Sequence, residues 1–189
     1  MASLITKGRT EPCLNNIGGI NKVHLFKFVD YQRYLIEVSN GYLTSFPTTE
    51  VNTFELMADG NNLAIDLQED ENGVSYNQSL SIVIKGNNYN NIDFYDLLNL
   101  RVGCIVELRS GVIQIIGLYN GCKVKSVKGQ TGGGYTDFNG INIEIEAREK
   151  ESVFYLTDLV SVGFEITENF IFQDGNNFIF QDGNNFIFN

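Results

Sequence analysis

The stretch INIEIEARE, at residues 141–149, carries the clearest structural signal in this sequence. Ile141, Ile143 and Ile145 alternate with polar residues, two of which, Glu144 and Glu146, are acidic. Successive side chains of a β-strand point to opposite faces, so this alternation predicts a strand with an apolar face inward and an acidic face outward. The fold is therefore expected to contain a half-buried sheet.

Other segments carry the same kind of signal. In QSLSIVIKG, residues 78–86, Leu80, Ile82 and Ile84 fall on one face of a predicted strand. Short runs rich in β-forming residues and bounded by turn residues predict further strands at 22–29, 34–39, 53–58, 62–67, 102–108, 112–119, 122–127, 153–160 and 162–167. The dipeptide Asn120-Gly121 is the strongest hairpin-turn signal among them.

One segment, residues 90–101, has the pattern of an α-helix. An Asn can cap its start, Asp93 and Asp96 lie in its first turns, and Phe94, Leu97 and Leu98 form one apolar stripe. Many short strands around one helix predict a mainly β fold, an antiparallel β-sandwich or barrel with one flanking α-helix at about residues 90–101.

Composition limits the possible functions. The chain has 189 residues, which suit one domain with an appendage, and its net charge of -10 argues against a surface that holds nucleic acid. Cys13, Cys104 and Cys122 have no spacing typical of a disulfide framework or a zinc site, so they are expected to be buried thiols of a protein made in a reducing cytoplasm. No stretch has the length of a signal peptide or a membrane span, so export and membrane insertion by the usual routes are not expected.

Candidate catalytic residues are few. His24, the only histidine, lies in an alternating stretch without acidic or Cys neighbours at ligand spacing, so a core or strand-surface role is favoured over a triad or a metal site. The carboxylates of residues 69–71 and the pair Glu144 and Glu146 leave a glycosidase-like acid and base open, although solvated side chains are the favoured interpretation. No cofactor, metal site or enzyme activity is predicted.

Two loops resemble ligand-binding motifs only superficially. The glycines of KGQTGGGYTDFNG, residues 128–140, lead into a predicted strand rather than a helix, which favours a flexible linker over a phosphate-binding loop. The spacing of DENGVSYN, residues 70–77, does not match a calcium-binding EF-hand loop.

The chain ends in a repeat of FIFQDGNN units, residues 169–189. Each Phe-Ile-Phe run favours a strand, and the intervening Asp, Gly and Asn residues favour turns, so the repeat predicts a small meander or an extended arm. A disordered low-complexity end is the alternative. We expect a domain at 1–167, with an N-terminal arm at 1–21, and an extension at 168–189. The predicted subunit-interface residues are Phe170, Ile171, Phe172, Phe178, Ile179, Phe180, Phe186, Ile187 and Phe188.

From about residue 51 to 156 the sequence resembles a group of virion structural proteins from tailed phages of Bacteroidetes-type hosts, and more loosely phage tail-tube subunits. The similar elements are the strand at 82–85, the predicted helix, the G-x-Y-x-G turn at 117–121, and the loop of residues 131–140 leading into the Ile/Glu strand with Glu149 after it. These motifs consist of turn and strand residues rather than catalytic ones.

The resemblance implies a tail-tube-like β domain that assembles with itself into a ring, expected to be a hexamer. Rings would stack into a tube in the virion tail, contact a tape measure or terminator protein, and let DNA pass without holding it. Glu144 and Glu146 would then be lumen-facing acidic residues that repel phosphates. The alternatives are a neck, tail-terminator or other ring protein of the same virion and, from another class, a small glycan-binding or glycan-active module.

Overall fold

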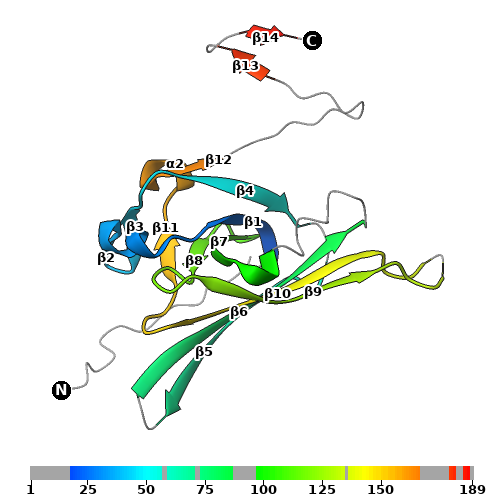
Figure 1. The fold of residues 1–189 in the computed structure, drawn as a ribbon, viewed down its shortest axis with the longest axis horizontal. Coiled ribbons are helices and arrows are strands. Elements are labelled where there is room, and N and C mark those ends of the chain that lie inside the picture. The colour runs from blue at the N-terminus through cyan, green and yellow to red at the C-terminus, as the bar shows by residue number, and fades with distance from the viewer. Residues whose placement is uncertain are drawn as a thin grey trace, which may run out of the picture.

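The computed structural model describes residues 18–56, 59–70, 73–86, 97–134, 136–166, 179–181 and 185–187. Within these ranges, the side chains of residues 31–33, 70, 97, 179–181 and 185–187 are not described. The fold is mainly β, and its sheet curls into a half-barrel (Figure 1).

Twelve strands belong to one mixed sheet. They are β1 (Ile20–Lys27), β2 (Glu37–Ser39), β3 (Tyr42–Ser45), β4 (Thr49–Glu55), β5 (Asn62–Asp70), β6 (Gly73–Lys85), β7 (Arg101–Leu108), β8 (Ile113–Ile116), β9 (Cys122–Gln130), β10 (Gly140–Glu149), β11 (Phe154–Leu156) and β12 (Phe164–Ile166). The helical segments are η1 (Asp30–Leu35), η3 (Leu97–Asn99) and α2 (Leu159–Val162), of which η1 and η3 are 3-10 turns. Two further strands, β13 (Ile179–Gln181) and β14 (Asn185–Ile187), pair antiparallel with each other.

Strand β7 organises the sheet. Along one edge it pairs with β1, which in turn pairs with β4. Along its other edge, residues 101–102 of β7 pair with β9 and residues 104–107 pair with β8. Strands β8 and β9 therefore lie end to end along the same edge of β7. From β8 the sheet continues through β11 and β3 to β2, whereas from β9 it continues through β10 and β6 to β5. The sheet therefore divides at the junction between β8 and β9.

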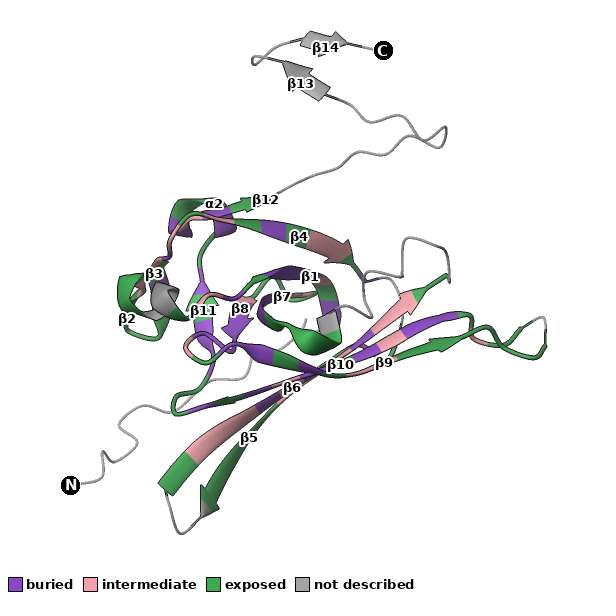
Figure 2. Ribbon diagram, viewed as in Figure 1, coloured by how far each residue is buried: buried purple, intermediate pink, exposed green. Residues whose placement is uncertain are grey.

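Two hydrophobic cores lie on opposite faces of the central strands. The first is enclosed by the curl of the sheet and contains the apolar face of β10 and β6 together with Val23 and Leu25 of β1. The second contains Phe26, Phe46 and Phe164, whose ring centroids lie 4.7 to 5.5 Å apart. Figure 2 shows buried residues along β1, β7, β8 and β10, and exposed residues at the end of the β5–β6 hairpin.

The strand patterns read from the sequence agree with the burial of the side chains. Ile141, Ile143 and Ile145 are 0 to 1% exposed, whereas Glu144 is exposed. The apolar face of β6 behaves in the same way, with Leu80 and Ile82 each 1% exposed. The alternation predicted which face of each strand forms the core because that face depends on local geometry alone.

The helix predicted at about residues 90–101 is wrong wherever the structure describes it. Residues 90–96 lie outside the described ranges, Leu97–Asn99 form a 3-10 turn, and Arg101 already belongs to β7. Pairing of β7 with its neighbours overrides the local helical pattern. The α-helix that is present, α2, is a single turn within a segment predicted as strand; the Asp158 side chain caps it and Gly163 ends it at φ 123°.

Three other expectations are corrected. The sheet is not purely antiparallel, because β3 pairs parallel with β11 and β4 parallel with β12. It forms a half-barrel rather than a closed barrel or sandwich. Asn120-Gly121 does not join a hairpin, because β8 and β9 both pair with β7 and not with each other. In addition, β1 begins at Ile20, inside the range assigned to the N-terminal arm, of which residues 1–17 lie outside the described part.

Residues 117–121 form a loop that interrupts pairing along this edge of β7, between the end of β8 and the start of β9. The two ends of this loop are close, since Gly121 N donates to Gly117 O at 2.9 Å. Both glycines have positive φ, 62° and 72°, and neither has room for a Cβ: one at Gly117 would meet Cys122, and one at Gly121 would meet the ring of Phe28. The loop therefore requires glycine at both ends.

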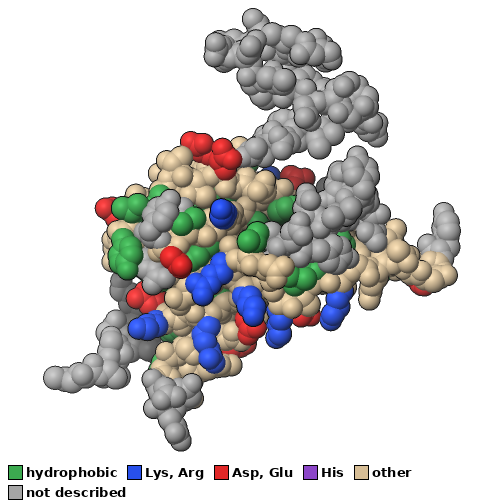
Figure 3. Space-filling model, viewed as in Figure 1, with side chains coloured by type: hydrophobic (Ala, Val, Ile, Leu, Met, Phe, Trp, Pro, Cys, Tyr) green, Lys and Arg blue, Asp and Glu red, His purple; other side chains and the backbone are tan. Residues whose placement is uncertain are grey.

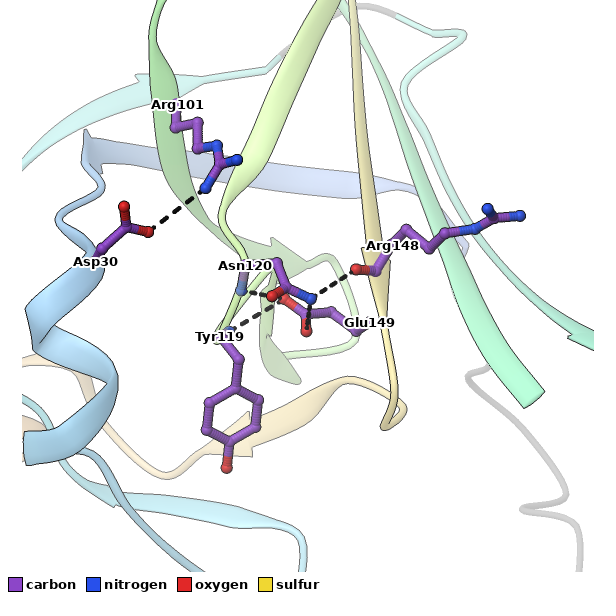
Figure 4. A network of polar contacts seen from close by, with 6 residues as sticks. All are labelled: Asp30, Arg101, Tyr119, Asn120, Arg148 and Glu149. Carbon is purple, nitrogen blue, oxygen red and sulfur yellow. Dashed lines mark hydrogen bonds and ion pairs between the residues drawn. The ribbon is translucent and has the colours of Figure 1, made fainter. Parts of the chain in front are cut away.

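Two buried polar side chains from neighbouring strands satisfy the backbone of this loop. The Oε1 atom of Glu149, which is 4% exposed, accepts hydrogen bonds from Tyr119 N at 3.1 Å and Asn120 N at 2.8 Å. Its Oε2 accepts from Asn120 Nδ2 at 2.9 Å (Figure 4). Gln78, 1% exposed, accepts from Gly117 N at 2.9 Å. Glu149 is therefore the carboxylate that holds the junction between β8 and β9.

We expect Glu149→Ala to lower the free energy of unfolding by about 3 kcal/mol, because it removes a buried carboxylate and leaves the part-buried N–H groups of Tyr119 and Asn120 without their acceptor. Glu149→Gln keeps the shape but loses the charge, so its loss should be smaller. The control is Glu144→Ala, an exposed residue on the same strand, with an expected change within about 0.5 kcal/mol. Urea unfolding measures all three, and equal stabilities of the two alanine variants would contradict this role for Glu149.

Candidate functional site

The acidic residues predicted on β10 lie on the outward face of the β5–β6–β10–β9 part of the sheet. Glu144 is exposed and Glu146 is half-buried. Glu146 is directly opposite Ser79 of β6 on one side and Lys123 of β9 on the other. Lys125 Nζ lies 3.6 Å from Glu146 Oε2. The structure thus brings the two predicted carboxylates to one face, and one of them, Glu146, contacts a lysine.

We call this surface the charged face. Its residues, placed by strand register, are Asn62, Asp66 and Gln68 of β5, Asn77, Ser79 and Ser81 of β6, Asn142, Glu144, Glu146 and Arg148 of β10, Lys123, Lys125 and Lys128 of β9, and Arg101 of β7. Figure 3 shows Lys and Arg side chains gathered over this region. The charged face carries more basic than acidic side chains, although the chain as a whole is acidic. The predicted acidic strand is therefore not an acidic surface.

A groove of about 540 Å³ crosses the charged face. Its lining consists of Gln68, Asn77, Arg101, Asn120, Gly121, Cys122, Lys123, Glu146, Ala147 and Arg148. A second hollow of about 380 Å³ shares Asn77 and Glu146 with it and extends along β6 and β10. The loop held by Glu149 forms one wall of the groove, because Asn120 and Gly121 belong to that loop.

The groove contains three cationic side chains with different partners. Arg148 Nη2 donates to Gln68 Oε1 at 3.0 Å. Arg101 Nη1 lies 3.4 Å from Asp30 Oδ1, in a pair whose side chains are 62% and 69% exposed (Figure 4). Lys123 has no ion pair within the described residues. Exposed ion pairs contribute little to stability and exchange easily, so the groove can bind carboxylates or other anionic groups.

The cysteines cannot supply a nucleophile to this groove. Cys104 and Cys122 are free thiols, each 0% exposed. Burial raises the pKa of Cys104 well above its usual range, with the neighbouring Cys122 as a smaller cause. Burial also raises the pKa of Cys122, and Glu149 adds to that shift. Both thiols stay protonated and unreactive near neutral pH. The prediction of buried thiols is confirmed for these two residues, while Cys13 lies outside the described ones.

His24 is a core residue, 1% exposed. Its Nδ1 lies 2.8 Å from Thr53 Oγ1, and its Nε2 is 3.9 Å from Glu107 Oε2 and makes no hydrogen bond within the described part. Burial lowers the pKa of His24 from 6.5, an effect that Glu107 opposes and Lys22 reinforces. The histidine is therefore neutral near pH 7, as a core interpretation predicts.

The glycine-rich loop considered as a phosphate-binding motif is closed by its own aspartate. In the loop between β9 and β10, Asp137 Oδ2 accepts hydrogen bonds from Gly133 N at 2.9 Å and Gly134 N at 2.7 Å. These two bonds lower the pKa of Asp137. The chain's own carboxylate thus occupies the amides that a phosphate would need. Of the acidic run at 69–71, residues 69 and 70 end β5 and residue 71 lies outside the described part.

The predicted interface residues of the C-terminal repeat are not tested by the structure. Phe170, Ile171, Phe172, Phe178 and Phe188 lie outside the described residues. Ile179 and Phe180 belong to β13, and Phe186 and Ile187 to β14, with Phe180 opposite Phe186 in the backbone register. Their role at a subunit interface stays a prediction.

Among the residues that the structure describes, no group of three or more His, Cys, Asp or Glu side chains could hold a metal ion. No helix in the same ranges is long and apolar enough to cross a membrane.

Sequence reasoning missed the cationic part of the groove. The alternation of Lys123 and Lys125 with Cys122 and Val124 could have indicated a basic strand face. Arg101, however, precedes Lys123 by more than twenty residues and reaches it only because β9 follows β8 along β7. No local pattern carries that information.

We expect the free energy of unfolding to fall as the pH drops from 7.5 to 5.5. The folded-state pKa of His24 is below 6.5, so in this range the unfolded chain binds more protons than the folded one, and stability is lost as the pH falls. The slope from one group is at most about 1.4 kcal/mol per pH unit. Urea unfolding at several pH values should show a weaker dependence for His24→Gln than for the unchanged protein; parallel curves would contradict this assignment.

Comparisons of this chain with known protein families, with characterised proteins and with solved structures gave no match.

Proposed function

We propose that this chain is a phage virion structural protein, most like a tail-tube subunit, that assembles with itself into rings that stack around a DNA conduit. A tape measure or terminator protein would be its partner in the tail. The observation that supports self-assembly is the long hairpin of β5 and β6, which within the described residues has an unpaired strand edge and exposed apolar side chains on one face.

The apolar face of the hairpin extends past the first core. Next to the body, Leu63 of β5 faces the buried Leu80 of β6 and packs against the core. Farther along the same face, Ile65, Leu67 and Val74 are 37%, 61% and 50% exposed. Apolar side chains that continue a core face without cover indicate a surface that another protein covers.

The free edge of β5 supports the same conclusion. In the described part of the chain β5 pairs only with β6, so the other edge of a nine-residue strand has no strand beside it. A long open edge offers unpaired N–H and C=O groups for pairing with another chain, and proteins usually shorten or cover such edges. An assembly that adds a strand at β5 would remove this hazard.

A neck or terminator ring protein of the same virion would use the same surface without stacking into tubes. The glycan-binding alternative has weaker support, because the residues that line the groove include no aromatic side chain on which a sugar ring could stack. The described residues around the groove also supply no reactive thiol or histidine, which favours a structural role over an enzymatic one.

We expect the purified protein to form rings or hollow tubes in negative-stain images and to elute above its 21.2 kDa mass in size-exclusion chromatography. Leu67→Lys should weaken assembly at least about tenfold, because it places a charge in the covered apolar surface. The control is Val38→Lys on β2, an apolar side chain that is 38% exposed on the strand at the opposite end of the sheet from β5. Isolated rings would favour the neck or terminator alternative, and a monomer at all concentrations would exclude self-assembly.

A second prediction concerns the C-terminal repeat. Truncation after Thr167 should leave a folded domain, since the described cores contain no residue beyond Ile166, but weaken or abolish polymerisation. In the full chain, the Phe-Ile-Phe runs would pair as strands with a sheet edge of a neighbouring subunit. Circular dichroism checks the fold and electron microscopy checks the tubes. If the truncated protein forms tubes as readily as the full chain, the repeat has no part in assembly.

A further inference from the structure

Two pairs of like charges stand directly opposite each other in the sheet. Arg101 of β7 is opposite Lys123 of β9, and Glu50 of β4 is opposite Glu165 of β12. Directly opposite side chains share a face at close range, and like charges in such positions destabilise the sheet. A group of opposite charge that binds beside such a pair offsets the repulsion and stabilises the folded protein.

The basic pair lies in the groove of the charged face. Arg101, Lys123 and Arg148 all line it, against one carboxylate in the described lining, Glu146, which is opposite Lys123 in the strand register and contacts Lys125 outside the groove. Arg101 also pairs with Asp30, but both side chains are more than half exposed, so water screens that contact. The groove therefore keeps a net positive charge and a hollow that can accept carboxylates.

The acidic pair lies on the neighbouring strands β4 and β12. Glu50 and Glu165 are exposed, and no Lys or Arg among the described residues forms an ion pair with either of them. Their neighbours Val51 and Phe164 are each 0% exposed in the second core, so the backbone under the two carboxylates is firmly held. Within the described residues, strand β12 pairs only with β4.

One copy of the chain does not bring these two pairs together. Strand β1 separates β4 from β7, and Figure 3 shows acidic side chains over the α2–β12 end and basic ones over the region of β6, β9 and β10. Two copies can do so, because the pairs match in number and are opposite in sign. The contact would join different surfaces of the two copies, and such head-to-tail contacts generate rings or open filaments.

We propose that the groove containing Arg101 and Lys123 is a docking site for the β4–β12 edge of a second copy, whose Glu50 and Glu165 enter it. This inference rests on the self-assembly proposed above and names one of its contacts. Each contact adds attractions between opposite charges, which offset the repulsion within each like-charged pair. Salt at about 1 M shortens the screening length to about 3 Å, so assembly through this contact weakens as salt is raised.

Charge reversal tests the contact. Glu50→Lys with Glu165→Lys makes both surfaces basic, and Arg101→Glu with Lys123→Glu makes both acidic. Neither double variant should assemble alone, with at least about a tenfold loss, because each sets like charges against like. An equal mixture of the two should assemble again, since the reversed edge of one then meets the reversed groove of the other. The chain with all four changes should also assemble alone.

Matched controls separate this effect from a change in net charge. Glu37→Lys with Glu151→Lys, and Lys27→Glu with Lys85→Glu, make the same charge changes at exposed residues outside both pairs and should leave assembly intact. Thermal unfolding verifies that every variant is folded, and sedimentation measures assembly.

The outcomes are distinct. Restoration in the mixture supports the contact. Double variants that assemble like the unchanged protein, or a mixture that stays dissociated, overturn it while leaving self-assembly in place. An unchanged protein that never assembles overturns both the contact and the proposed function.

Discussion

The carboxylate of Glu149 is the contact on which the architecture depends. It accepts the backbone N–H groups of residues 119 and 120, and so lets the chain leave the line of β8 and return to it as β9. At that interruption the sheet divides, with β11, β3 and β2 on one side and β10, β6 and β5 on the other. A buried charge is costly unless it is fully hydrogen-bonded, and here the loop supplies the donors.

The division of the sheet also creates the charged face and the extended β5–β6 hairpin. The branch that starts at β9 extends away from the second core, so one of its faces closes the first core and the other becomes the charged face. The same branch ends in the β5–β6 hairpin, whose apolar face extends farther than the core that covers it. A protein that folds as a monomer gains no stability from either feature, whereas one that assembles with copies of itself can use both.

The charge distribution bears on the proposed role as a conduit for DNA. The net charge of -10 predicts a protein that repels phosphates, yet Glu144 and Glu146 share their face with Lys123 and Lys125. If this face met a DNA channel directly, its basic side chains would attract the backbone. Burial of the basic groove against an acidic edge of a neighbouring copy would leave the overall acidity to dominate the assembled surface.

The sequence by itself determined the inner faces of the regular strands, as Ile141, Ile143 and Ile145 illustrate, because a two-residue period is a local property of the backbone. Tertiary structure decided the rest. It made Arg101 the start of β7 instead of the end of a helix, and it placed Lys123 opposite Arg101. It also buried Glu149 against a loop about thirty residues earlier. Such contacts join residues far apart in the chain, and their energies depend on burial and pairing that no local pattern encodes.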